Sequence, residues 1–443
     1  MSAASHDGLL RRVLANTGIL LGGRTLNAIV ALGYLAVTAR ALGASQMGVL
    51  VLVNAFALTL GEIVKFQSWQ TVLQYGAAPL AEKRAEAFQR VVRFSVVLDL
   101  ISALGGAAIG VGGALLVGPY LGWAESVRPA AAVYALSIVF LASATPIGLL
   151  RLFNRFDLIA GQAAIGSLVR LIGGGLGLWF GWGLVPFLAV WAAGTVAAFI
   201  YIAGVSVFEL HRQDLLRGFS WKGPMAVHMP GVWRFAWATN FSSSLDVAFT
   251  HLVTLAVGAL LGPQPAALWS IGRQVADAIA KPAKLLAPAL YPELAKLKAA
   301  DGEFAMNKLA LQVGVFGGVL ATVLLLITIV AGKPLLGLVM GPTFEAAAGI
   351  MTWQVAAAVI GIWALPLEPM LVSLGRAGSA LKVRLVVCVV YLAALPPLVW
   401  SFGLTGAGAS IVAASTALGI GMLSMLKARP RTAPATTPRS APF

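Results

Sequence analysis

Cysteine is almost missing from this chain of 443 residues, since Cys388 is the only one. A single thiol makes no intramolecular disulfide and no zinc cluster, and its place in an apolar run is typical of a small hydrophobic side chain. The four histidines are scattered along the chain and form no metal-binding pattern. We therefore expect no metal centre and no cofactor.

Charged residues are also scarce. They make up 11% of the chain, while hydrophobic residues make up 59%, against about 25% and roughly 45–50% in soluble domains. Such a chain cannot coat a water-facing surface, so we expect lipid to be its main solvent. The net charge is nevertheless +15. Its cations are dispersed among apolar runs instead of gathered on one polar domain, which argues against nucleic-acid binding.

Twelve apolar runs are long enough to cross a membrane as helices, because a hydrocarbon core needs about 20 residues. They lie at about 14–39, 48–76, 92–117, 129–150, 158–180, 184–208, 233–260, 266–291, 309–331, 346–372, 381–401 and 405–426. The first run has full membrane length and contains Arg24, so we interpret it as a span and not as a cleavable signal peptide. The predicted fold class is all-α, a polytopic membrane protein with twelve transmembrane helices.

The positions of the cations predict the orientation. With the N-terminus in the cytoplasm, 22 of the 31 Lys and Arg residues fall in cytoplasmic segments, and only Arg40, Arg128 and Lys333 fall in outer loops. This split follows the positive-inside rule. We expect a multi-pass protein of the bacterial inner (cytoplasmic) membrane with both termini cytoplasmic. Residues 427–443 form a basic, Pro-rich tail that should be disordered and weakly attracted to anionic membrane lipids.

The two halves of the chain resemble each other at a fixed offset along the sequence. Leu42-Gly43 aligns with Leu261-Gly262, which defines this repeat offset, and "NRF" at 154–156 roughly matches "GRA" at 375–377. An even number of spans in each half makes the halves parallel repeats, so we expect two six-helix lobes around a central cavity. The predicted organisation is a cytoplasmic N-terminus (1–13), an N-lobe with spans 1–6 (14–208), a cytoplasmic connecting loop (209–232), a C-lobe with spans 7–12 (233–426) and the tail (427–443).

The eighth span carries a stripe of charge. Arg273, Asp277, Lys281 and Lys284 fall within about 80° of one another on an ideal helix and share one face. An ion inside a membrane costs roughly 2.5–3.5 kcal/mol on insertion scales, so these groups should face the bundle interior or a wet cavity. Three cations to one acid favour a site for an anion. The alternative is that Asp277 merely neutralises its neighbours by pairing along the helix.

The first two spans hold polar residues with two interpretations. Arg24 shares a face of its span with Asn27, and it could bind an anion or form a bridge to Glu62. Glu62 and Lys65 stand one turn apart, so they could line the cavity or form only a local ion pair.

The other spans hold further candidates. Arg170 lies near the middle of span 5 with no acid nearby on that helix. Asn240 and Asp246 share a broad face of span 7, and Asp246 could pair with a cation of span 8. Asp99 and Glu368 are plausible partners for the remaining cations.

Residues 22–63, "GGRTLNAIVALGYLAVTARALGASQMGVLVLVNAFALTLGEI", resemble the opening of the polysaccharide-biosynthesis oligosaccharide flippases. These belong to the multidrug/oligosaccharidyl-lipid/polysaccharide exporter superfamily. The matching features are the arginine of the first span, the "ARALG" turn at 39–43 and a second span that begins at Gly48. Residues 334–351 and 371–378 resemble patterns of the family's second half, and the likeness covers about 10–426.

This resemblance implies twelve helices in two lobes and the export of an undecaprenyl-pyrophosphate-linked oligosaccharide from the cytoplasmic to the periplasmic leaflet. Lipid-carrier flippases of this superfamily use cavity arginines for the pyrophosphate, and Arg24 and Arg273 look like their counterparts. Lys65, Lys281 and Lys284 are supported only by the charges in their spans. The partners implied are the lipid-linked oligosaccharide itself and a polysaccharide polymerase and glycosyltransferases of the same pathway.

We therefore hypothesise alternating access. Arginines and lysines of the cavity, Arg170 among them, would hold the pyrophosphate by charge-assisted hydrogen bonds, while the lipid tail stays between helices. An inside-negative membrane potential favours outward movement of an anion. Glu62, Asp246 or Asp277 could instead couple transport to Na⁺ or H⁺, and the sequence does not choose among them.

Two rival functions remain. A cation-coupled antiporter of the multidrug-extrusion type would need an acid-dominated cavity, and this chain places six cations against five acids in its spans. A membrane-embedded glycan-assembly enzyme would need a sizeable outer loop or an Asp-rich diphosphate motif, and the sequence has neither. The sequence thus favours a transporter over an enzyme.

Overall fold

The computed structural model describes the backbone of residues 3–223, 225–226, 229–247 and 251–427. Within these ranges it describes all side chains except those of residues 3–26, 241–247, 281–289, 291–293, 295–301, 303 and 377. This part of the chain forms helices and no strand, so the prediction of an all-α protein is confirmed.

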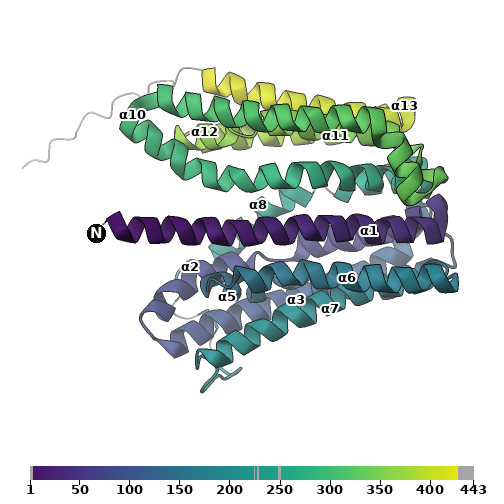
Figure 1. Ribbon diagram of the computed structural model, residues 1–443. Coiled ribbons are helices and arrows are strands. Elements are labelled where there is room, and N and C mark those ends of the chain that lie inside the picture. The colour runs from purple at the N-terminus through teal and green to yellow at the C-terminus, as the bar shows by residue number, and fades with distance from the viewer. Residues whose placement is uncertain (1–2, 224, 227–228, 248–250, 428–443) are drawn as a thin grey trace, which may run out of the picture.

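The helices fall into two consecutive sets (Figure 1). The first half contains α1 (Ala3–Val64), α2 (Ser68–Ala81), α3 (Ala85–Val117), the 3₁₀ helix η1 (Gly118–Leu121), α4 (Arg128–Ala135), the 3₁₀ helix η2 (Leu136–Leu141), α5 (Ala144–Leu152), α6 (Phe156–Phe180) and α7 (Leu184–Arg212). The second half contains α8 (Val232–Val247), α9 (Val253–Leu261), α10 (Pro263–Met340), the 3₁₀ helix η4 (Pro342–Phe344), α11 (Ala347–Trp363), α12 (Leu367–Ser373) and α13 (Ala377–Lys427).

Three of these helices are each two rods joined at a glycine. The backbone leaves the helical conformation with a positive φ at Gly43 in α1, Gly302 in α10 and Gly403 in α13. Glycine has no Cβ to oppose a positive φ, so it is the residue at which a chain of rods can turn sharply. Figure 1 shows α10 running along the molecule and returning beside itself.

Eight helices of the described residues are long and apolar enough to cross a membrane. Two of them, Asn27–Ala81 and Gly378–Lys427, contain 55 and 50 residues, more than twice the roughly 20 that one crossing needs. The predicted spans 233–260 and 266–291 fall partly outside the described residues. The count of twelve therefore stays a prediction, while the polytopic character is confirmed.

The two halves turn at matching places. Positive φ angles occur in the first half at Gly43, Lys83, Gly122, Asn154 and Gly181, and in the second half at Gly262, Gly302, Gly341, Gly375 and Gly403. When the two sets are paired in this order, the residues of the first three pairs are as far apart in sequence as Gly43 and Gly262. The residues of the last two pairs are slightly further apart. The backbone thus repeats at the offset that the sequence suggested. The boundaries of the predicted lobes remain a proposal.

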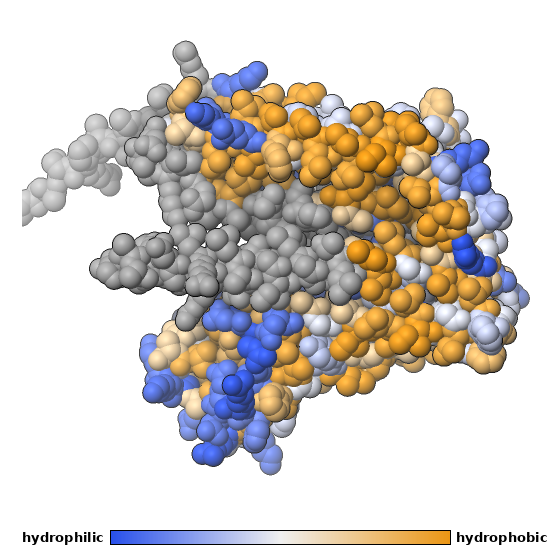
Figure 2. Space-filling view, viewed as in Figure 1, coloured by the Kyte–Doolittle hydropathy of each residue, from blue (hydrophilic) through white to orange (hydrophobic). Residues whose placement is uncertain are grey.

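The outer surface is apolar. Long side chains such as Leu116, Trp179 and Phe316 are exposed, and Figure 2 shows apolar residues covering the flanks of the bundle, outside the grey region. Polar side chains such as Thr38 and Asp99 are buried instead. This distribution is the reverse of that in a soluble protein and suits a bundle surrounded by lipid.

Three predicted spans are interrupted. The run 48–76 breaks between α1 and α2, the run 129–150 contains η2, and the run 346–372 breaks before α12. The second interruption packs on glycine, since a Cβ added to Gly110 of α3 would lie 2.6 Å from the Cδ1 atom of Ile138. The third break ends at Pro366, and proline has no N–H for the helical ladder.

The halves meet in tight contact near the Gly43 and Gly262 turns. A Cβ added at Gly48 would overlap the backbone of Pro263, and one added at Gly258 would overlap the side chain of Leu52. One hydrophobic core, which includes Met47 and Trp269, continues through both halves. Direct backbone packing therefore joins the halves at this end, which is the outer end in the predicted orientation.

The segment between α7 and α8 is bound to the first half. The Gln89 side-chain amide of α3 donates to the carbonyl oxygens of Leu215 and Arg217, at 2.8 and 2.9 Å. Arg93, one turn further along α3, donates to the carbonyls of Ser220, at 2.7 Å, and of Lys222. The connecting segment is therefore held by side chains of α3 up to Lys222.

Candidate binding cavity

A cavity of about 680 Å³ lies in the first half. It is formed by α1, α5, α6 and α7, and α10 of the second half reaches it through Gln274. Its polar lining consists of Asn27, Glu62, Lys65, Ser143, Arg151, Gln162, Ser167, Arg170, Thr195 and Gln274. Three cations thus face one carboxylate, and the rest of the polar lining is amides and hydroxyls.

Arg170 of α6 is held by aromatic rings. Its guanidinium carbon lies 5.1 Å from the centre of the Trp191 ring and 5.7 Å from that of Tyr34, and Nη2 donates to Thr195 Oγ1 at 3.0 Å. Gly194 makes room for it, because a Cβ there would lie 2.9 Å from Arg170 Cγ. Among the described residues no carboxylate pairs with this cation. A guanidinium packed against aromatic faces and fixed at one end is a geometry that suits the binding of an anion.

Lys65 lies directly after the end of α1, where the helix breaks. Its Nζ atom is 3.1 Å from Glu62 Oε1, so the local ion pair considered for these two residues is formed. The Asn240 amide of α8 donates to the Lys65 carbonyl oxygen at 2.8 Å, which joins the second half to this break. Glu62 is therefore already neutralised within the cavity wall.

Two polar contacts complete the lining. Ser167 donates to Asn27 Oδ1 at 2.7 Å, which links α6 to α1. The Arg151 guanidinium lies over the ring of Trp69, 4.1 Å from its centre. Arg151 follows an apolar run and was predicted to be a cytoplasmic loop cation. It lies instead in the last turn of α5.

Arg273 and Asp277 line a separate cavity of about 200 Å³ in the second half, together with Gln354 and Ser415. Arg273 Nε lies 3.6 Å from Asp277 Oδ2, so the predicted pairing along this helix is present. The side chains of four other predicted site residues lie outside the described residues: Arg24, Asp246, Lys281 and Lys284. The structure thus brings Asn27, Glu62, Lys65 and Arg170 together and places Arg273 and Asp277 in another cavity.

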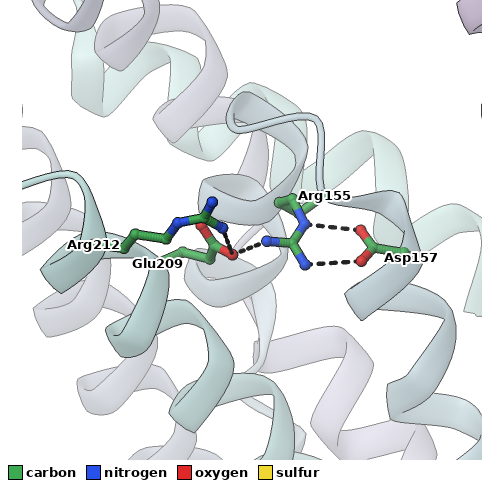
Figure 3. Close-up of polar contacts among 4 residues, drawn as sticks. All are labelled: Arg155, Asp157, Glu209 and Arg212. Atoms are coloured by element: carbon green, nitrogen blue, oxygen red, sulfur yellow. Dashed lines mark hydrogen bonds and ion pairs between the residues drawn. The ribbon is translucent and has the colours of Figure 1, made fainter.

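A cluster of four charges ties α6 to α7 (Figure 3). Arg155 forms a two-pronged contact with Asp157, at 3.0 and 2.9 Å, and also pairs with Glu209 of α7. Arg212 pairs with the same Glu209 at 3.8 Å. In the second half Arg376, which matches Arg155 in the repeat, donates to the carbonyl oxygen of Met425 at 2.8 Å. In each half, therefore, an arginine that precedes one helical rod binds the far end of the following rod. We call these two contacts the arginine clamps.

Residues 13–298 match the model of a family described as polysaccharide biosynthesis protein. The chain belongs to this family. Inner membrane protein YghQ of Escherichia coli (strain K12) is 32% identical over 340 residues, which cover 76% of this chain and 94% of that protein. The resemblance seen in the sequence is confirmed, and the chain is a multi-pass membrane protein.

Two solved structures share the fold of this chain. The lipid II flippase MurJ in an inward closed conformation has a TM-score of 0.75 and 12% identity, over 92% of this chain and 87% of that one. An inward-facing multidrug resistance transporter of the MATE family has a TM-score of 0.71 and 14% identity, over 91% and 94%. At these identities the likeness shows the fold alone.

Proposed function

We propose that the protein is a flippase that exports an undecaprenyl-pyrophosphate-linked oligosaccharide, the repeat unit of a polysaccharide, across the inner membrane by alternating access. The observation that carries the proposal is the cavity of the first half. It has three cations against one carboxylate, and that carboxylate is paired with Lys65. Membership of a polysaccharide biosynthesis family supports the class of substrate.

The cavity offers a group for each part of such a substrate. Arg170 can donate from its guanidinium to a pyrophosphate oxygen, and charge-assisted hydrogen bonds of this kind are about twice as strong as neutral ones. The amides and hydroxyls of the wall, such as Gln162 and Thr195, suit sugar hydroxyls. The polyprenyl tail needs no pocket, because the outer surface of the bundle is apolar.

An antiporter for organic cations shares this fold, but the charges argue against it. Such a transporter needs a carboxylate that is free to meet a cation. Among the described residues of the two cavities, Glu62 is paired with Lys65 and Asp277 with Arg273. The net charge of the described lining therefore favours an anionic head group.

The decisive experiment is complementation of a strain that lacks this gene. We expect Arg170→Ala to abolish surface polysaccharide and to leave lipid-linked oligosaccharide on the cytoplasmic face of the membrane. Arg84→Ala is the matched control, because Arg84 is exposed and pairs with Glu82 outside the cavity. Full export by Arg170→Ala at wild-type protein levels would refute the proposed site.

Arg24 and Arg273 are tested in the same strain. We propose that both contribute to binding of the pyrophosphate, as the family resemblance implies. Single Arg24→Ala and Arg273→Ala variants should each lower export. If both retained wild-type export, the anion site would be confined to the first-half cavity and this part of the proposal would be wrong.

A further inference from the structure

A buried carboxylate lies where α2, α3 and α5 pack against one another. Asp99 of α3 is 4% exposed. Its Oδ2 atom accepts hydrogen bonds from the N–H and the hydroxyl of Thr145, at 2.8 and 2.7 Å. Its Oδ1 atom is buried and has no hydrogen-bond partner. Half of this carboxylate is therefore satisfied by α5, and the other half still requires a partner.

Three hydroxyls in the same region are also buried without a hydrogen-bond partner. Ser68, Thr71 and Ser95 are each at most 1% exposed, and each oxygen lacks a hydrogen-bond partner. Ser68 and Thr71 stand one turn apart on α2, and Ser95 stands one turn before Asp99 on α3. The Ser68 hydroxyl faces the Asp99 carboxyl without completing a hydrogen bond of normal geometry.

Buried hydroxyls elsewhere in the chain behave differently. Thr38, Thr59 and Ser206 each donate to the carbonyl four residues earlier, at 2.7 to 2.8 Å. Within a helix this acceptor is available to a buried serine or threonine, so burial alone need not leave such a hydroxyl unsatisfied. The Ser95 hydroxyl, inside α3, does not use it, and Ser68, as the first residue of α2, has no such acceptor in its own helix.

Two helix breaks meet at this cluster. Ser68 is the first residue of α2, directly after the break that follows α1, and Thr145 lies in the first turn of α5, after the break that follows η2. Lys65 and Ser143, which flank the two breaks, also line the cavity. Interrupted helices beside an intramembrane carboxylate are a geometry in which transporters bind monovalent cations.

One of the two helix breaks recurs in the second half without these polar groups. At the repeat offset, Ser68, Thr71, Ser95 and Asp99 correspond to Ala287, Leu290, Gly314 and Gly318. The second half nevertheless contains the matching break before α12, where a Cβ added to Gly314 would lie 3.4 Å from Pro366 Cγ. The polar cluster therefore has no counterpart in the second half, where the break before α12 forms without such groups and α10 continues unbroken at the positions that match the break between α1 and α2.

We infer that this cluster is a Na⁺ site, with Asp99 Oδ1 and the hydroxyl oxygens of Ser68, Thr71 and Ser95 as its ligands. Hard cations bind through several oxygens, and four buried oxygens without a hydrogen-bond partner come from the packed helices α2 and α3 around Asp99. A proton on Asp99 would complete only one hydrogen bond and would leave two hydroxyls without partners. Lys65 acts on Asp99 through its charge and is itself paired with Glu62.

The site goes beyond the proposed function, because Na⁺ binding requires no knowledge of the exported molecule. Its position behind Lys65 and Ser143 would let bound Na⁺ influence the shape of the cavity wall. The tests of the two proposals are separate, since one measures glycan export in cells and the other measures ion binding to purified protein.

The experiment is a thermal unfolding series on the full-length protein in detergent. Ionic strength and pH are held constant while NaCl replaces choline chloride. We expect Na⁺ to raise the unfolding temperature in a saturable way, and Asp99→Asn to abolish the shift. Ser95→Ala should keep the fold and weaken the apparent Na⁺ affinity about tenfold or more, as the loss of one ligand worth about 1.4 kcal/mol would do.

Ser102→Ala is the matched control. Ser102 is also a buried hydroxyl of α3, but it donates to the Asp99 carbonyl oxygen at 2.9 Å and has no need of an ion. We expect this variant to keep the wild-type Na⁺ response. The inference is overturned if the wild type responds equally to Na⁺ and choline, if it responds to pH and not to Na⁺, or if Ser95→Ala and Ser102→Ala behave alike.

Discussion

A single guanidinium, that of Arg170, combines the features expected of an anion-binding group in a membrane. It is charged, it lies against two aromatic rings, and no described carboxylate neutralises it. Arginine and lysine differ at such a position, because lysine has neither the planar face for stacking nor the fork of donors. Substitutions of Arg170 can therefore separate the role of its charge from the role of its planar shape.

Arg170→Lys should retain part of the export activity, while Arg170→Ala should lose it. A hydrogen bond to a charged group contributes about 1.5–3 kcal/mol, so we expect the rate of lipid-linked oligosaccharide export to fall by roughly 10- to 150-fold in the alanine variant. The measurement is time-resolved appearance of the glycan at the periplasmic face. Equal rates for the lysine variant and the wild type would mean that stacking on Trp191 and Tyr34 has no role.

For single residues, the sequence predicts which charged side chains lie within the spans but not which side chains surround them. Arg170 and Lys65 were identifiable because an ion inside an apolar run needs a reason. The aromatic rings around Arg170 were not, since Tyr34 and Trp191 come from other helices and packing between helices leaves no trace in a linear pattern. Arg151 was missed because a cation at the end of a span is most often a topology signal.

Among the elements, the turns within α1 and between α9 and α10 depend on glycine. Gly43 (φ 66°, ψ 175°) and Gly262 (φ 93°, ψ −179°) occupy a backbone region that is essentially restricted to glycine. Gly181 at the end of α6 (φ 66°, ψ 37°) is instead left-handed helical, a conformation that asparagine also adopts.

Gly43→Asn and Gly262→Asn should therefore destabilise the protein more than Gly181→Asn does. The strain at the first two positions is on the order of 1–3 kcal/mol, so their apparent unfolding temperatures in detergent should drop while that of the Gly181 variant stays near the wild type. Similar losses at Gly43 and Gly262, which are repeat partners, are also expected. A Gly181→Asn variant as unstable as the other two would contradict this assignment of strain.

Interruptions of helices show where prediction from the sequence ends. Pro366 lies at one break and predicts it, but the 3₁₀ segment Leu136–Leu141 itself contains no proline and no charged residue. That segment fits because α3 offers glycines to it, Gly110 among them. A helix's local sequence therefore does not contain the reason for its own interruption.

The whole molecule has a predicted orientation that can be tested directly. Cys388 is the only cysteine and is buried, so a Cys388→Ala background accepts single reporters. Glu125→Cys, in a predicted outer loop, should react with a membrane-impermeant maleimide in intact spheroplasts. Glu82→Cys, in a predicted cytoplasmic turn, should react only after lysis, although both side chains are exposed. The opposite labelling pattern would invert the topology.

The properties of the whole molecule were the ones best predicted from the sequence. Composition predicts a membrane protein, the fixed offset between the halves predicts a duplicated chain, and three of the five pairs of positive φ angles recur at that offset. These features are global sums over many residues, so single errors cancel. The sequence could not foresee that the charges of the two halves line separate cavities, because that depends on how the rods pack.

The binding of the connecting segment to α3 has a consequence for how the protein can be assembled. Contacts from Gln89 and Arg93 hold this segment up to Lys222, and the arginine clamps at Arg155 and Arg376 each lie within one half. A gene cut between the codons of Gly223 and Met229 would therefore leave both clamps intact and would keep the part of the connecting segment that α3 holds joined to the first half. Co-expressed from two open reading frames, the pieces should co-purify and restore export, whereas a cut between Gln213 and Asp214 should give far less of the two-piece protein.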